Sequence, residues 1–151
     1  LIYKVNRVNE PHVPLAAYKE MNVYKLFVLD VGLLGAMSDL DAMSILEGND
    51  IFVEFKGALT EQYVLQQLIS DTPYTPYYYG NEKATFEQDF LIQKAKSIVP
   101  IEVKAEQNIR SHSLKTYCEK FQPEEAVRFS TLKYKEQERM VNIPLYAVCN
   151  L

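Results

Sequence analysis

The sequence contains few of the residues from which common redox, zinc and nucleotide sites are built. Its 151 residues include only two cysteines, Cys118 and Cys149, and two histidines, His12 and His112, which stand far apart. This spacing argues against a disulfide framework and a zinc site, and it fits a reduced, cytoplasmic environment. Only five glycines are present, and none forms a glycine-rich phosphate loop.

Long hydrophobic runs are also missing. No apolar stretch approaches the roughly 18 residues that a membrane span requires, and no signal-peptide hydrophobic region follows Leu1. We therefore expect a cytoplasmic domain without a membrane partner. Because the first residue is a leucine and not a methionine, we also expect a fragment of a longer protein. The length is sufficient for one domain with a hydrophobic core.

The charge is mildly acidic and unevenly distributed. The net charge of −4 argues weakly against nucleic-acid binding, which usually requires a basic surface. Residues 1–82 contain 5 Lys/Arg and 11 Asp/Glu, whereas residues 83–121 contain 7 and 5. A small basic surplus therefore surrounds the stretch EQDFLIQKAKSIVPIEVKAEQ at 87–107, although chance clustering explains a surplus of this size equally well.

The hydrophobic pattern alternates between strands and helices, which predicts an α/β sheet flanked by helices. Residues 24–29 are typical of a buried strand, and Asp30 has the position of a helix N-cap before 31–37. Helices are expected at 55–70 and 111–121. Strands are expected at 75–79, 85–93, 98–104, 126–130 and 143–148, with a connector at 9–14 and a loop with a short helix at 39–50.

A predicted hairpin carries the first candidate site residues. Side chains alternate between the two faces of a strand, so Glu102 and Lys104 share a face. A tight turn at Ala95–Lys96 would place Asp89 opposite Glu102, with Cβ atoms about 4.5–5.5 Å apart. Carboxylates this close repel unless a cation lies between them, and Mg²⁺ commonly takes one or two protein carboxylates. The alternative is a hairpin with a solvated charged face, which alternation alone also predicts.

Glu61 is a further candidate ligand. Successive residues of a helix are rotated by about 100°, which places Glu61 in the middle of an apolar arc with Val64, Leu65 and Leu68. A buried, ionised carboxylate is costly unless it is paired or bound to a metal. Glu61 is therefore either a metal ligand that faces the hairpin or a structural residue bonded to a buried arginine or a backbone amide.

Over nearly its whole length the chain resembles a domain of unknown function that follows the ATPase domain in many bacterial and archaeal AAA-type ATPases. The resemblance runs through PHVPLAAYKEMNVYKLFVLDVGLLGAM at 11–37, FKGALTEQYVLQQL at 55–68, FEQDFLIQKAKSIVPIEVKAEQN at 86–108, SLK at 113–115 and NIPLY at 142–146. That domain is similar to the PD-(D/E)XK nuclease superfamily, which has the restriction-endonuclease-like fold.

The resemblance implies a mixed β-sheet flanked by helices. Residues 1–50 would form an N-terminal connecting segment of strand plus short helices, and residues 51–151 the nuclease-like domain. In that superfamily a helix Glu, a strand Asp and an E-x-K sequence bind a divalent metal and cleave phosphodiesters. Carried over, Glu61, Asp89 and Glu102 would bind Mg²⁺ or Mn²⁺, and Asp89, Glu102 and Lys104 would be catalytic. Lys115 would contact nucleic acid, and the implied partners are DNA and a covalently linked ATPase domain.

Three functions are compatible with the sequence. The intact set of candidate residues favours a magnesium-dependent, endonuclease-like phosphodiesterase that acts on DNA. The acidic composition favours an inactive module of the same fold, which would bind nucleic acid or protein and regulate the ATPase. It also fits a structural oligomerisation domain, whose interface could use some of the 11 Tyr and 7 Phe, although core packing accounts for most aromatic residues.

Overall fold

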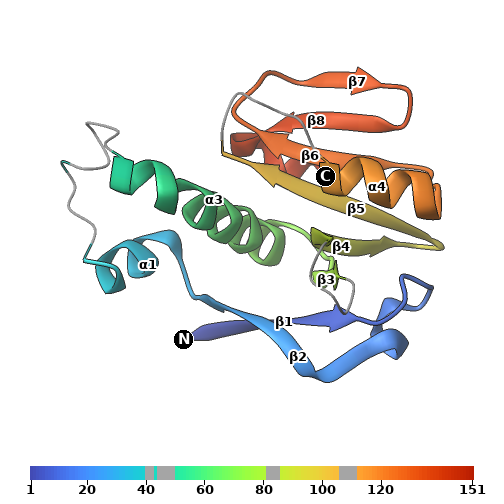
Figure 1. Ribbon diagram of the computed structural model, residues 1–151, viewed down its shortest axis with the longest axis horizontal. Helices are drawn as coiled ribbons and strands as arrows, with labels where there is room; N and C mark the ends of the chain where they lie inside the picture. The colour runs from blue at the N-terminus through green and yellow to red at the C-terminus, as the bar shows by residue number, and fades with distance from the viewer. Residues whose placement is uncertain (40–42, 44–49, 81–85, 106–111) are drawn as a thin grey trace.

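The chain folds into a mixed β-sheet flanked by helices, the α/β class that the sequence predicts (Figure 1). The computed structural model describes residues 1–39, 43, 50–80, 86–105 and 112–151. Within these ranges, no helix is both long enough and apolar enough to cross a membrane.

The described residues form one eight-stranded sheet with the strand order β2-β1-β3-β4-β5-β6-β8-β7. The pairs β1–β3, β5–β6 and β6–β8 are parallel, and the other neighbouring pairs are antiparallel. Residues 1–50 therefore contribute two strands to the same sheet as the rest of the chain. The strands are β1 (Ile2–Val8), β2 (Lys19–Val28), β3 (Tyr77–Gly80), β4 (Glu87–Lys94), β5 (Ser97–Lys104), β6 (Ala126–Ser130), β7 (Lys135–Gln137) and β8 (Met140–Pro144).

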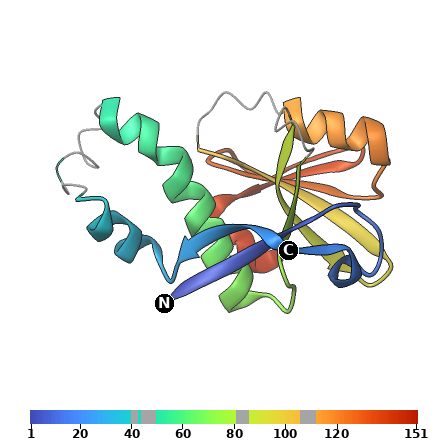
Figure 2. The ribbon, with the colours of Figure 1, turned by 60° about the horizontal axis from the view of Figure 1, so that its bottom comes forward.

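Helices lie on both sides of this sheet (Figure 2). The N-cap predicted at Asp30 is confirmed, because its Oδ1 accepts a hydrogen bond from the N–H of Leu33 at 2.8 Å. The helices are α1 (Val31–Met37), α3 (Asp50–Asp71) and α4 (His112–Phe121), and the 3₁₀ helices are η1 (Leu15–Tyr18) and η2 (Leu145–Asn150).

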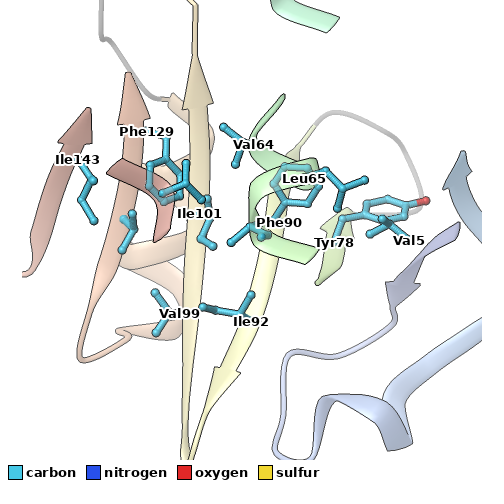
Figure 3. Close-up of a cluster of buried hydrophobic side chains, with 13 residues drawn as sticks. Val5, Val64, Leu65, Tyr78, Phe90, Ile92, Val99, Ile101, Phe129 and Ile143 are labelled. Atoms are coloured by element: carbon cyan, nitrogen blue, oxygen red, sulfur yellow. The ribbon is translucent and has the colours of Figure 1, made fainter. Parts of the chain in front are cut away.

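Two hydrophobic clusters hold α3 and α4 against opposite faces of the sheet. Phe90 and Leu91 are consecutive in β4 and point to opposite faces. Phe90 belongs to the larger cluster, beside Val64 and Leu65 of α3 (Figure 3). Leu91 belongs to the smaller cluster with Tyr117 of α4. Each fully buried side chain of this size contributes roughly 1.5–3 kcal/mol, so the clusters fix both helices relative to the hairpin of β4 and β5.

A side-chain amide fastens α3 to the outermost strand. Because β2 is at the edge of the sheet, the backbone groups along its outer side have no neighbouring strand. The buried Gln62 donates from Nε2 to the carbonyl oxygen of Val28 at 2.8 Å, and its Oε1 accepts from the N–H of Val28 at 3.1 Å. We call this pair of bonds the Gln62 clamp. It holds the preceding helix residue, Glu61, beside β2.

Two of the strand predictions are wrong in part. Residues 24–29 do not form a buried strand, because β2 is an edge strand whose Tyr24 and Leu26 are 43% and 59% exposed. Residues 143–148 are not a strand throughout. β8 ends at Pro144, which has no N–H to donate to a ladder, and η2 follows. β1 and β7 were not predicted, and the loop with a short helix expected at 39–50 lies mostly outside the described residues.

Candidate functional site

The hairpin of β4 and β5 has the register that the sequence predicts. Lys94 pairs with Ser97 across the turn Ala95–Lys96, and the ladder ends with Phe90 opposite Ile101. The next residues on the two strands are Asp89 and Glu102, which are therefore neighbours across the hairpin.

Asp89 bonds to the backbone of β5 through its side chain. Its Oδ2 accepts a hydrogen bond from the N–H of Val103 at 2.7 Å. The carboxylate thus occupies the position that a carbonyl oxygen would have if the ladder continued. This bond fixes Asp89 against the end of β5 at which Glu102 and Lys104 lie.

The ladder between β3 and β4 is irregular next to Asp89. The register between β3 and β4 shifts by one residue, which leaves Asp89 and Phe90 both opposite Tyr78. A bulge interrupts the alternation of side chains and can re-aim one of them. Phe90 packs on the α3 side of the sheet, and the charge of Glu61 on α3 acts on Asp89 as well. The strand carboxylate of Asp89 and the helix carboxylate of Glu61 are therefore close enough for their charges to interact.

The surroundings of Asp89 disfavour its ionised form. Burial raises the pKa of Asp89, and the negative charges of Glu102 and Glu61 raise it further, to about 7. The N–H of Val103 and the ammonium of Lys25 act in the opposite direction. A carboxyl group perturbed in this way by other carboxylates is stabilised in its ionised form when a cation binds beside it.

Glu102 is the most buried of the candidate carboxylates, with an exposure of 2%. Its Oε1 lies 2.6 Å from Nζ of Lys104. Its Oε2 is buried and has no hydrogen-bond partner among the described residues. Leaving a buried acceptor without a partner costs about 1–3 kcal/mol, so such an atom calls for a bound water or ion. Oε2 is the atom of this site best placed to bind a ligand.

A row of polar side chains continues from Glu102 across β6 and β8. Glu102 is in register with Arg128, and Arg128 with Asn142, so the three side chains share one face of the sheet. Nε of Arg128 donates to Oδ1 of Asn142 at 3.0 Å, and the hydroxyl of Ser130 donates to the same oxygen at 2.8 Å. Burial lowers the pKa of Arg128, and the charge of Glu102 opposes this effect. Sequence analysis missed Arg128, although a charge inside the apolar strand AVRFS is a usable signal.

Glu61 is ion-paired with a lysine that sequence analysis also missed. Nζ of Lys25 lies 2.9 Å from Oε1 of Glu61 and 2.6 Å from Oε1 of Glu87. Burial would lower the pKa of Lys25, but the two carboxylates outweigh burial and raise it above its ordinary value. The partner of Glu61 in this structure is thus a lysine of the edge strand, which neither sequence-based alternative included. The signal was a charged residue within the apolar run YKLFVL.

Lys115 lies apart from this group of residues. It is on α4, with its side chain 77% exposed and its ammonium 3.8 Å from Oε1 of Glu119, one helical turn further on. Within the described part of the chain, the salt bridge of Lys115 is with Glu119, whereas Glu102 and Lys104 pair with each other. The structure therefore brings Asp89, Glu102 and Lys104 together, with Glu61 and Lys25 adjacent. Lys115 lies on α4, which covers the face of the sheet opposite to α3.

The carboxylates fit a divalent cation as a pair. Across the described residues, no group of three or more His, Cys, Asp or Glu side chains is arranged to hold a metal ion, and Glu61 is engaged by Lys25. Asp89 and Glu102 are neighbours one step beyond the pair of Phe90 and Ile101, and Oε2 of Glu102 has no hydrogen-bond partner among the described residues. Because Mg²⁺ commonly takes only one or two carboxylates and completes its shell with water, these two residues are the ones that could hold such a cation.

Comparison with known proteins gives one match. A family model described as a domain of unknown function, DUF4143, matches residues 56–148. No curated protein and no solved structure matches the chain. The matched segment contains Glu61, Asp89, Glu102 and Lys104, whereas Lys25 lies before it.

Proposed function

We propose that this chain, which belongs to the DUF4143 family of domains of unknown function, is a metal-dependent phosphodiesterase domain of the endonuclease type that acts on DNA. The observation that supports the proposal most is Oε2 of Glu102, buried and without a partner in the described residues. Across the hairpin from it lies Asp89, whose pKa is raised to about 7. A divalent cation shared by the two carboxylates would account for both features.

The order of the elements supports the same proposal. Helix α3, strands β3, β4 and β5, helix α4 and strand β6 follow one another along the chain. It is the order that the sequence pattern predicts, and it carries the helix Glu, the strand Asp and the E-x-K that the resemblance implies. Asp89 near the start of β4, and Glu102 and Lys104 at the end of β5, then occupy neighbouring strand ends.

Each residue has a role that its surroundings suggest. When bound, Mg²⁺ or Mn²⁺ would polarise a phosphate and lower the pKa of a coordinated water. Asp89 and Glu102 would hold the cation, and the pKa of Asp89 allows it to ionise near neutral pH. Lys104 is half-buried beside Glu102, where its ammonium would stabilise the negative charge that develops on the phosphate oxygens.

Calorimetric titration of Mg²⁺ and Mn²⁺ tests the metal site. The wild-type chain should bind cation at millimolar concentration or below, and the cation should raise its melting temperature by mass action. Asp89→Asn should lose both effects and keep the fold, because asparagine can still accept the hydrogen bond from Val103. Absence of binding to the wild type at millimolar concentration would contradict the proposal.

A plasmid-nicking assay tests the chemistry. Lys104→Ala should reduce the nicking rate far more than it weakens metal binding, because the lysine acts on the transition state and not on the cation. Lys96→Ala, in the turn at the opposite end of the hairpin, removes the same charge and should leave both quantities unchanged. An equal loss of rate in the two variants would argue against a role of Lys104 in the reaction.

The second candidate function is an inactive module of the same fold that binds nucleic acid or protein and regulates a linked AAA-type ATPase domain. The ion pair of Lys25 with Glu61 favours it, because the lysine supplies the positive charge that a metal would supply to the helix carboxylate. Metal binding without cleavage, tested in the full-length protein that carries the ATPase domain, would support this second function and contradict the first.

A further inference from the structure

We propose that a cavity beneath α4 binds the phosphate groups of a nucleic-acid strand next to the candidate cleavage site. The inference deepens the proposed function and rests on it. The cavity has a volume of about 380 Å³ and is lined by α4, β6 and the hairpin of β7 and β8. Three of its lining residues carry cationic groups, namely Lys115, Arg128 and Arg139, and one is acidic, Glu138, while most of the surface inside the cavity is apolar.

The inner wall of the cavity adjoins the candidate carboxylates. Arg128 is 4% exposed and is in register with Glu102 on the neighbouring strand, and the charge of Glu102 acts on its guanidinium. A phosphate held near Arg128 would therefore lie one strand away from Glu102. Because phosphates recur along a nucleic-acid strand, one strand could occupy the cavity and the metal site together.

The outer wall carries cations that can move to meet a ligand. Lys115 and Arg139 are exposed and come from elements far apart in the sequence. The pair of Lys115 with Glu119 is solvent-exposed, and exposed pairs of this kind contribute little stability. Lys115 can therefore exchange this carboxylate for a phosphate at low cost. Both side chains lie at the surface, where they can add to the attraction of the buried Arg128 for an anion.

The remaining walls strengthen the attraction. Leu114, Cys118 and Met140 line the cavity with apolar atoms, and a charge pair attracts more strongly where water is displaced. Cys118 also lies close to the outer cation, because the charge of Arg139 opposes the rise in thiol pKa that burial causes. A ligand that contacts Arg139 should therefore also shield the thiol of Cys118.

Alkylation of Cys118 reports occupancy of the cavity without metal or cleavage. The chain has two cysteines, so Cys149→Ser leaves Cys118 as its single thiol. Iodoacetamide alkylation is measured in EDTA with a short single-stranded oligonucleotide, with inorganic phosphate at the same phosphate concentration, or with neither. The oligonucleotide should slow alkylation at least about fivefold, and inorganic phosphate much less, because a strand presents several phosphates at once.

Two variants separate the cavity from the general charge of the chain. Arg139→Ala should weaken oligonucleotide binding about tenfold and reduce the slope of log affinity against log salt concentration by about one. Lys135→Ala removes the same charge from the exposed strand β7, outside the cavity, and should change the affinity less than about twofold. Fluorescence anisotropy with a labelled oligonucleotide measures both.

Several results would overturn the inference. It fails if the oligonucleotide does not protect Cys118, or if Arg139→Ala behaves like Lys135→Ala. Equal protection by inorganic phosphate would identify a small phosphate ligand and overturn the assignment to a strand. Protection in EDTA by a chain that binds no metal would support the cavity and contradict the cleavage function. Metal binding without protection of Cys118 would support the metal site and contradict the cavity.

Discussion

A single carboxyl group, that of Asp89, couples the stability of this fold to pH. Its pKa is raised from 3.8 to about 7 by burial and by the charges of Glu102 and Glu61. Between these two values the folded state binds more protons at this group than the unfolded state does. The free energy of unfolding should therefore fall as the pH rises, by up to about 1.4 kcal/mol per pH unit from this group alone. The loss continues through pH 7 and levels off about one pH unit above it, where the group is ionised in both states.

Asp89→Asn should remove this pH dependence in metal-free protein, because asparagine does not ionise. At pH 8 the variant should be more stable than the wild type by about 2–4 kcal/mol, and near pH 4 the two should be similar. Urea unfolding in EDTA at both pH values measures the difference. If the difference in unfolding free energy between wild type and variant were the same at pH 8 as at pH 5, ionisation of Asp89 would not destabilise the folded state.

Lys25→Met should destabilise the chain by about 2–3 kcal/mol, because the change leaves Glu61 and Glu87 facing each other without a cation. The estimate lies at the low end for a broken buried pair, since both Lys25 and Glu61 keep some contact with solvent. Chemical unfolding measures the loss. Lys19→Met, at an exposed position of the same strand, is the matched control and should change stability by less than about 0.5 kcal/mol.

A double-mutant cycle tests the origin of that loss. Glu61→Gln in the Lys25→Met background should recover part of the lost stability, because it removes an uncompensated charge. Additive effects of the two substitutions would show that the ion pair contributes nothing beyond the packing of the lysine stem.

At the scale of elements, the hairpin that carries Asp89 and Glu102 contains a strained turn. Ala95 has φ = 51°, a left-handed conformation that costs an L-residue roughly 1–2 kcal/mol. Ala95→Gly should therefore stabilise the chain by about 0.5–1 kcal/mol, once the larger entropy of unfolded glycine is included. Thermal unfolding measures the gain. Ala17→Gly is the control, because Ala17 in η1 has no left-handed strain to relieve and its replacement should destabilise the chain by a similar amount. If both substitutions shifted stability in the same direction, strain at Ala95 would not be the explanation.

The same hairpin shows which features of the fold local sequence can predict. Its register follows from alternating side chains and a two-residue turn, so the pairing of the two strands up to Phe90 and Ile101 was predictable. The bulge opposite Tyr78 was not, because it depends on pairing with β3, a strand that precedes β4 across a separate connection. The exposure of β2 was missed for a related reason: an apolar pattern does not tell a central strand from an edge strand.

Non-local pairing also explains which parts of the site escaped prediction. Lys25 and Glu61 are 36 residues apart, and only the packing of α3 against the edge strand brings them together. Arg128 reaches Glu102 through a parallel pairing whose crossover includes α4. Both Lys25 and Arg128 are charged residues inside an apolar strand, which is a weak signal of a functional role. The sequence pattern does not indicate which residue each of them contacts.

At the scale of the whole molecule, the N-terminal strands share the sheet and the hydrophobic clusters with the strands that carry the site. Val5, Val8 and Leu15 are almost completely buried, although they precede the segment 56–148 that defines the family. A fragment of residues 51–151 would lose them together with Lys25. Burial of these three side chains is worth roughly 5–9 kcal/mol, which is comparable to the whole stability of a typical domain.

The fragment 51–151 should therefore lack a cooperative unfolding transition at 25 °C, whereas the complete chain should show one. Circular dichroism during heating compares the two. A fragment that melts cooperatively near the temperature of the complete chain would mean that β1 and β2 are an accessory to an independent domain.

The Gln62 clamp has a consequence for how these molecules behave in a crowded solution. A sheet edge with exposed apolar residues, as β2 has in Tyr24 and Leu26, is a template on which another chain can add a strand. At Val28 the amide of Gln62 already satisfies both backbone groups, so an incoming strand would find neither donor nor acceptor there. One glutamine side chain thereby shortens the length of sheet edge to which another strand can add.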